Sequence, residues 1–204
     1  MIVSSYGDCY ARISGCNAHQ RIVLSEALLA TKQWEEVVPG ISSVTVTYSE
    51  DLTPAVVERM LKSIIRVCDT TIPDRGKSIS FPISYGGSDG PDLEQLAKRY
   101  CVSEADIIKQ HQACIYTVEM MGFTPGFAYL SGFKNDWSIA RHATPAKEIP
   151  AGSVGVVGAQ CGIYGLKGPG GWPIIGRADA QFFDVTRDNP FLLSAGMRVR
   201  FQSV

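Results

Sequence analysis

The sequence predicts an α+β protein in which an N-terminal ferredoxin-like α/β domain is followed by a small, partly closed β-barrel. Two features predict this class. Over the first 85 residues, strand and helix periodicities follow each other in the order β-α-β-β-α-β, which is the order of a ferredoxin-like split motif. From residue 114 onward the apolar runs are short and are separated by Gly and Pro, as in small β-barrels. We therefore place two domains, at residues 1–78 and 79–204.

Capping and alternation signals predict the N-terminal elements. Asn17 and Gln20 have the spacing of a capping box and precede apolar residues at helical spacing, which predicts a helix to about residue 33. Thr53 and Pro54 predict the start of a second helix that ends near residue 67. Strands are predicted at residues 9–13, 35–38, 44–48 and 79–85, the second and third as a hairpin. The pattern leaves open which domain the last of these strands joins.

The C-terminal part begins with two short helices and continues with strands. Pro91 predicts the start of the first helix, and Ser103 with Asp106 has capping-box spacing for a second helix that runs to about residue 110. Between residues 69 and 77 a polar loop is expected. The clearest strand signals beyond these helices lie at residues 114–120, 152–157, 181–185 and 197–201.

Composition narrows the class of function. The 204 residues are 45% hydrophobic and 19% charged with a formal net charge of −1, so a buried core is feasible and clustered positive charge for nucleic acid or an anionic membrane is not indicated. The first residues lack a basic region followed by an apolar run, which predicts a cytoplasmic protein. Six cysteines occur without a C-x-x-C pair and are expected to be reduced thiols.

The segment from Pro150 to Arg177 has an unusual glycine content. It holds nine glycines in 28 positions, together with three prolines and one tryptophan. Glycine allows positive φ angles and close approach of the backbone to a ligand, while proline stiffens a loop, so this composition can hold the Trp172 indole against a cavity. Tight turns between barrel strands explain the glycines equally well.

A second segment, residues 121–130, places three aromatic residues around the Pro125–Gly126 turn. Phe123, Phe127 and Tyr129 form either an apolar core plug beneath a loop or the wall of a pocket. Thr124 and Tyr129 add hydroxyl groups. Sequence alone slightly favours the plug.

Other chemistries lack a signature. Neither G-x-x-x-x-G-K-[ST] nor a G-x-G-x-x-G between a strand and a helix is present, so autonomous nucleotide binding is not predicted. His111 and Cys114 are too few ligands for zinc, and we expect no metal site. Cys161 is a nucleophile only where a nearby base lowers its pKa, and a small buried thiol is the more ordinary role.

Four runs of residues resemble the B-subunit family of 5-oxoprolinase, also described as KipI-like or allophanate hydrolase subunit 1. They are residues 83–93, 121–130, 150–155 and 162–177, with further similarity at Phe183–Asp184 and residues 196–201. The resemblance is specific from about Ile79 onward. Over residues 1–78 it rests mainly on the order of helices and strands. It implies a cyclophilin-like β-barrel behind the α/β domain, without implying prolyl isomerase activity.

The resemblance also implies a function within a complex. Such proteins act with a C subunit (KipA-like, allophanate hydrolase subunit 2) and an A subunit in the ATP-dependent opening of 5-oxo-L-proline to L-glutamate. This chain is then expected to be inactive alone and to bind no cofactor, with ATP used by the complex. Inhibition of a sensor histidine kinase, and a carboxyltransferase role in urea or allophanate metabolism, are the alternative functions.

Eight residues are predicted to bind a small-molecule lactam substrate. Phe123, Phe127 and Trp172 are expected as walls and Thr124 and Tyr129 as polar contacts, while Arg141, Gln160 and Tyr164 are expected to orient a polar substrate. Departures from the family pattern fall close to these residues: Cys161 and Gly165 stand where Thr and Pro are common, and residues 141–146 contain one arginine where more are expected. No catalytic residue is assigned.

Overall fold

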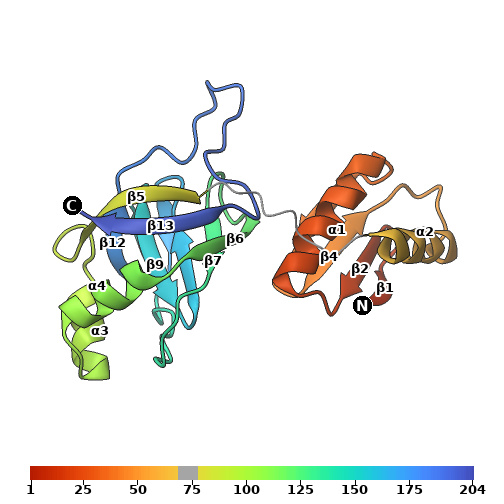
Figure 1. The fold of residues 1–204 in the computed structure, drawn as a ribbon. Coiled ribbons are helices and arrows are strands. Elements are labelled where there is room, and N and C mark those ends of the chain that lie inside the picture. Colours follow the sequence, from red (N-terminus) through yellow and green to blue (C-terminus); the bar gives the residue numbers. More distant parts are fainter. Residues whose placement is uncertain (69–77) are drawn as a thin grey trace. The chain divides into compact units, whose positions relative to one another are not determined.

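The computed structural model describes residues 1–68 and 78–204. The chain divides into two compact units, Met1–Arg75 and Gly76–Val204, and each is described by itself (Figure 1). The polar loop expected at residues 69–77 lies outside the described residues.

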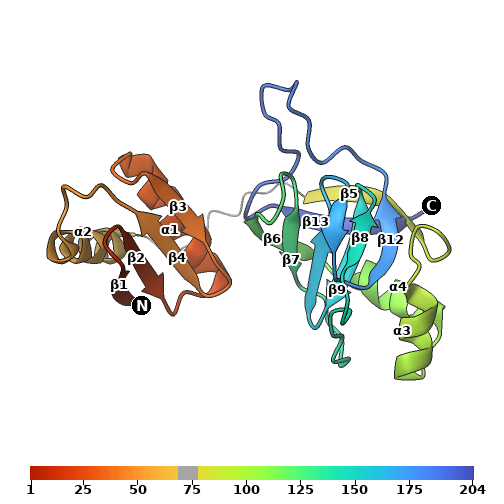
Figure 2. The same cartoon turned by 180° about the vertical axis from the view of Figure 1, so that it is seen from behind.

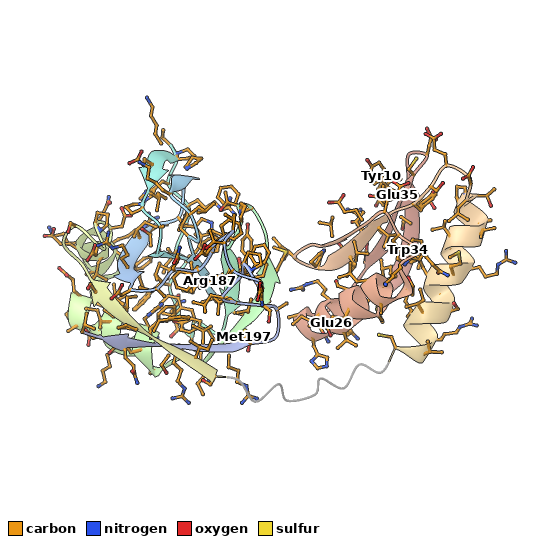
Figure 3. All side chains as sticks on the ribbon, turned by 90° about the horizontal axis from the view of Figure 1, so that it is seen from above. Tyr10, Glu26, Trp34, Glu35, Arg187 and Met197 are labelled. Carbon is orange, nitrogen blue, oxygen red and sulfur yellow. The ribbon has the colours of Figure 1, made fainter. Side chains whose placement is uncertain are left out.

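The first unit is a four-stranded antiparallel sheet with both of its helices on one face (Figures 1 and 2). The strand order is β1-β2-β4-β3. Alternate residues of β2 and β4 join leucines of the two helices in one core, which also holds Trp34 (Figure 3). Its elements are β1 (Ile2–Tyr6), β2 (Tyr10–Ser14), α1 (Ala18–Thr31), β3 (Glu36–Pro39), β4 (Ser43–Thr47) and α2 (Pro54–Val67).

The capping signals of this unit are confirmed in part. The Asn17 side chain accepts from the Gln20 backbone N–H at 2.8 Å, and the Gln20 side chain accepts from the Asn17 N–H at 3.0 Å. This reciprocal pair satisfies two N–H groups that a helix start leaves free, and it fixes the beginning of α1. Pro54 begins α2 as predicted, although the Thr53 side chain makes no cap hydrogen bond.

The predicted ferredoxin-like order is wrong in one respect. The edge of the sheet next to β2 is filled by β1, which sequence reasoning missed. The strand after α2, whose domain the sequence left open, joins the second unit. Strand β1 pairs with β2 through a short turn at Gly7, whose φ is 55°. The element order is therefore β-β-α-β-β-α.

The second unit is a closed seven-stranded barrel, more complete than the partly closed barrel predicted. The strand order is β10-β7-β6-β13-β5-β12-β9, and β13 runs parallel to β5 while the other neighbours are antiparallel. The barrel strands are β5 (Ser78–Tyr85), β6 (Tyr116–Met121), β7 (Ala128–Ser131), β9 (Ser153–Val157), β10 (Gln160–Ile163), β12 (Ile174–Ala178) and β13 (Arg198–Ser203).

Two helices connect β5 to β6. Helix α3 (Leu93–Tyr100) begins two residues after the predicted Pro91, and α4 (Glu104–Ala113) begins with the predicted capping box of Ser103 and Asp106. His111 of α4 contacts side chains of β5, β6, β10 and β13, so this helix closes one end of the barrel.

The strand predicted at residues 181–185 does not form. That segment belongs to a long connection between β12 and β13 (Figures 1 and 2), with one isolated bridge between Phe183 and Phe191. Asp184 accepts from the Thr186 N–H and pairs with Arg187 at 3.2 Å. This local turn satisfies backbone groups that a strand would pair in a sheet.

Side-chain alternation divides the barrel residues between an interior and an outer face. In β7 and β10, Ala128, Leu130, Cys161 and Ile163 belong to the main core. The neighbouring Phe127 and Tyr129, with Tyr164 and Ile174, form a separate cluster on the other face. A two-stranded sheet of β8 (Ala146–Ile149) and β11 (Gly168–Gly170) contributes Ile149 to this outer cluster.

Candidate functional site

An aromatic cavity of about 310 Å³ lies on the outer cluster of the barrel. We call it the aromatic cavity, and its lining residues are Phe123, Phe127, Tyr129, Arg141, His142, Pro145, Tyr164, Pro169, Gly170, Gly171 and Trp172. The size suits a small molecule, and the lining has the character of a ligand site, with mainly apolar walls and few polar groups.

The rings of this cavity pack edge to face around Phe127. Its centroid lies 4.7 Å from that of Tyr129, 4.9 Å from that of Tyr164 and 6.1 Å from that of Trp172. Such tilted pairs hold one another in fixed orientations and leave ring faces available. Phe127, Tyr164 and Trp172 are buried, whereas Phe123 is 62% exposed at the rim.

Glycines make room for these rings. A Cβ at Gly162 would lie 2.8 Å from Phe127 Cζ and 3.1 Å from Trp172 Cζ3. A Cβ at Gly170 would lie 2.6 Å from Ile149 Cδ1 and would overlap the Tyr164 hydroxyl. At these positions the glycines of the Pro150–Arg177 segment are spacers beneath aromatic side chains as well as turn residues.

Polar groups of the aromatic cavity carry donors. The Arg141 guanidinium lies 5.8 Å from the Trp172 ring centroid and is exposed at the cavity mouth. Burial raises the pKa of both Tyr129 and Tyr164, so their hydroxyls stay protonated at neutral pH. Because the Tyr164 oxygen takes a hydrogen bond from the Trp172 backbone N–H, its own proton remains to be donated.

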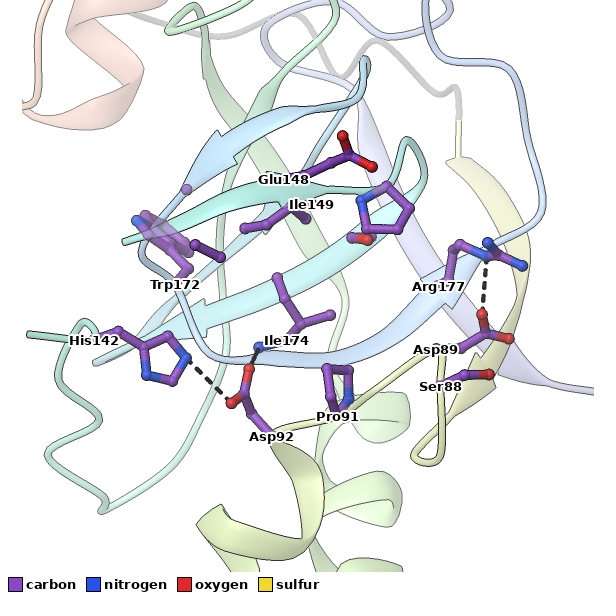
Figure 4. A pocket seen from close by; sticks show the side chains of 14 residues that line it. Ser88, Asp89, Pro91, Asp92, His142, Glu148, Ile149, Trp172, Ile174 and Arg177 are labelled. Carbon is purple, nitrogen blue, oxygen red and sulfur yellow. Dashed lines mark hydrogen bonds and ion pairs between the residues drawn. The ribbon is translucent and has the colours of Figure 1, made fainter. Parts of the chain in front are cut away.

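A second cavity of about 220 Å³ shares His142, Gly170 and Trp172 with the first (Figure 4). We call it the carboxylate cavity, since three acidic side chains line it: Asp89, Asp92 and Glu148. Arg177 pairs with Asp89 at 3.1 Å, and Asp92 pairs with His142 at 3.2 Å. Glu148 forms an exposed ion pair with Lys167 at 2.9 Å, which is expected to add little stability.

Six of the eight predicted substrate-binding residues line the aromatic cavity: Phe123, Phe127, Tyr129, Arg141, Tyr164 and Trp172. The structure does not bring Gln160 and Thr124 into it. Gln160 begins β10, at the opposite end of that strand from Tyr164, and pairs with Ser131 and Val157. The Thr124 Oγ1 atom is buried and has no hydrogen-bond partner in the described part of the chain.

Sequence reasoning missed Asp92 as a site residue and treated His142 only as part of a loop. Both lie in connections between regular elements, 50 positions apart, so no local spacing joins them. The one available signal was the Gly90-Pro91-Asp92 run inside a segment that resembles the family.

The barrel interior holds a second histidine close to a cysteine. His111 Nε2 lies 3.5 Å from Cys161 Sγ, and His111 Nδ1 lies 2.7 Å from the Tyr85 hydroxyl. Both His111 and Cys161 are fully buried, and burial lowers the pKa of His111 to about 3 and raises the pKa of the Cys161 thiol well above its usual value. A neutral, fully buried thiol that lines neither of the two cavities is a packing residue, so the nucleophile interpretation of Cys161 is not supported.

Within residues 1–68 and 78–204, no cluster of three or more His, Cys, Asp or Glu side chains has an arrangement suited to a metal ion. The described helices are also too short or too polar to cross a bilayer.

Comparison with known proteins identifies the family. Residues 9–193 match the family model described as carboxyltransferase domain, subdomain C and D. The 5-oxoprolinase B subunit of Haemophilus influenzae is 41% identical over 170 residues, which is 81% of this chain and 78% of the relative. The 5-oxoprolinase B subunit of Escherichia coli O157:H7 is 36% identical over 180 residues, covering 87% of this chain and 82% of the relative.

Among solved structures, that of the protein TTHA0988 aligns with all of this chain at a TM-score of 0.81 and 29% identity. This chain spans 40% of the length of that protein. The likeness therefore extends over both units described here, and the chain belongs to the B-subunit family of 5-oxoprolinase.

Proposed function

We propose that this chain is the B subunit of an ATP-dependent 5-oxoprolinase that converts 5-oxo-L-proline to L-glutamate, and that the aromatic cavity binds the lactam. The observation that carries the proposal is the cavity itself: a small apolar site with one cation at its mouth and two tyrosine donors, in a chain of this family. Such a set matches a small ring that bears one carboxylate and one carbonyl.

Each part of the ligand has a matching group. The aromatic faces of Phe127 and Trp172 are expected to contact the five-membered ring. The Arg141 guanidinium is suited to the carboxylate, because it offers paired N–H donors in a plane. Tyr129 and Tyr164 can donate to the lactam carbonyl, whose oxygen gains negative charge when the ring is attacked.

The complex supplies what this chain lacks. We propose that an A subunit and a KipA-like C subunit complete the enzyme in the cytoplasm, that the complex consumes ATP, and that this chain binds no cofactor and is inactive alone. The names of the relatives as B subunits support an assembly of several different chains.

The Arg141 assignment gives the decisive test. In the reconstituted complex, Arg141→Gln removes a charge-assisted pair worth about 1.5–3 kcal/mol, so the KM for 5-oxoproline is expected to rise about 10- to 100-fold. Binding of 2-pyrrolidone, which has no carboxylate, should not change. Arg200→Gln removes an exposed cation from β13 and serves as the matched control.

Two results would contradict the proposal. A wild-type complex that does not turn over 5-oxoproline excludes the activity. A variant at Arg141 that binds 5-oxoproline as the wild type does excludes the aromatic cavity as the site of the carboxylate.

A carboxyltransferase component is the second candidate function, because the matched family model describes carboxyltransferase subdomains. That activity requires carboxybiotin and an acceptor amide such as urea. Transfer of the carboxyl group from carboxybiotin to urea by the purified complex, with no turnover of 5-oxoproline, would favour it.

A further inference from the structure

Asp92 and His142 form a carboxylate–imidazole pair in the lining of the carboxylate cavity (Figure 4), and His142 also lines the aromatic cavity. Asp92 Oδ1 lies 3.2 Å from His142 Nε2, and Asp92 Oδ2 accepts from the Ile174 backbone N–H at 2.7 Å. The His142 backbone N–H in turn donates to the Gly171 carbonyl at 2.7 Å. Both partners are therefore held by main-chain bonds to the segment that carries Trp172.

This geometry fixes the proton on one nitrogen of the ring. An ionised carboxylate only accepts hydrogen bonds, so the nitrogen that faces Asp92, Nε2, carries the hydrogen. The neutral imidazole then has its lone pair on Nδ1. Nδ1 is therefore the atom of His142 that can accept a proton, and His142 lines the aromatic cavity.

The surroundings distinguish this pair from an ordinary surface contact. Isolated exposed pairs of this kind contribute little and are not held in one geometry. Here the Asp92 side chain is only 19% exposed, and the His142 side chain is 35% exposed and lines both cavities. The other histidines are placed differently: His111 is buried in the barrel, and His19 lies on α1 of the first unit.

We propose that His142 is the acid–base residue of this cleft and that Asp92 is its positioning residue. The proposal rests on the proposed 5-oxoprolinase function. Nδ1 takes one proton from a water molecule as the water oxygen bonds to the carbonyl carbon of the lactam, and the complex couples this ring opening to the ATP that it consumes. The same proton passes to the ring nitrogen as the C–N bond breaks, so one water is consumed and His142 returns to its starting form.

Kinetics of the complex, with its partner subunits present, test both roles. His142→Gln should lower kcat about 100- to 10,000-fold, the usual contribution of general acid–base catalysis, while KM stays within about threefold. Asp92→Asn keeps an oxygen for the Ile174 N–H but turns a donor toward the ring, so kcat should fall at least about tenfold at similar KM. Asp184→Asn is the matched control, because Asp184 pairs with Arg187 at 3.2 Å, its side chain is 18% exposed and it lines neither cavity; its kcat should stay within about threefold.

A spectroscopic measurement separates positioning from packing. Nitrogen chemical shifts of ¹⁵N-histidine in the wild-type chain should show His142 protonated on Nε2, and in Asp92→Asn they should show it protonated on Nδ1. A merely structural role of Asp92 would leave the tautomer unchanged.

The outcomes are distinguishable. Wild-type turnover with undiminished kcat in His142→Gln overturns the acid–base role and leaves the proposed function standing. An unchanged tautomer in Asp92→Asn overturns the positioning role. Absence of turnover in the wild-type complex overturns the proposed function and this role together.

Discussion

The buried His111 predicts a specific loss of stability in acid. The ring is fully buried and faces the side chains of Tyr85, Tyr116, Cys161 and Phe201, none of which is charged at neutral pH. Burial lowers its pKa to about 3, whereas an unfolded histidine has a pKa of about 6.5. Below pH 6.5 the unfolded chain binds a proton that the folded chain does not bind, so stability is full above that pH and falls as the pH decreases toward 3.

The magnitude follows from proton linkage. Each pH unit inside this window costs about 1.4 kcal/mol, so moving from pH 7.5 to pH 4.5 should cost the barrel about 3 kcal/mol through this residue. Replacing His111 with Gln removes the titrating group. The variant should then lose about 3 kcal/mol less than the wild type between these two pH values.

Urea unfolding at both pH values measures the difference. A Trp34→Phe background leaves Trp137 and Trp172 as fluorescent reporters, and both belong to the second unit. Equal sensitivity to acid in the wild type and in His111→Gln would refute the reasoning.

Three further substitutions test the aromatic cavity. Thr124→Val should leave turnover within about twofold and raise the free energy of unfolding by up to about 1 kcal/mol, since the buried hydroxyl it removes has no partner in the described part of the chain. A large loss of turnover would show that Thr124 belongs to the site. Phe123→Gly should weaken lactam binding without lowering the melting temperature, because Phe123 is 62% exposed and has a φ of 74°, where glycine relieves about 1 kcal/mol of backbone strain. Calorimetric titration measures the binding and thermal unfolding measures the stability. A clear drop in melting temperature would contradict the assignment of Phe123 to the rim. Gly162→Ala should cost about 1–3 kcal/mol and raise KM, since its Cβ would displace Phe127 or Trp172, and an unchanged KM would show that these rings do not shape the site.

Much of the fold was predictable because its signals are local. The capping boxes at Asn17 and Ser103 satisfy N–H groups within one turn of chain, so the sequence identifies both helix starts. Strand β1 escaped prediction because its residues are mostly exposed and show no buried alternation. The destination of β5 was equally hidden, since its pairing with β13 joins residues about 120 positions apart and depends on closure of the barrel.

The candidate site was predictable only where residue type alone carried the signal. Six aromatic or basic residues were found because large rings beside Gly and Pro require an unusual environment. Gln160 was included for its polarity, but position along β10 decides what it contacts, and it lies at the far end from Tyr164. Asp92 and His142 meet through tertiary structure, which composition and spacing do not encode.

The glycines of the Pro150–Arg177 segment acquire their meaning from strand alternation. In β10, Cys161 and Ile163 point into the barrel core, so Gly162 between them faces the aromatic cavity, where a side chain would collide with Phe127. Gly165 packs directly on Gly126: a Cβ there would lie 2.4 Å from the Gly126 carbonyl carbon. The absence of a side chain at both glycines lets Phe127 and Gly126 pack closely here. Cys161 and Gly165 therefore lie outside the lining of the aromatic cavity, so the surface that we propose for the lactam is formed by residues such as Phe127, Arg141 and Trp172.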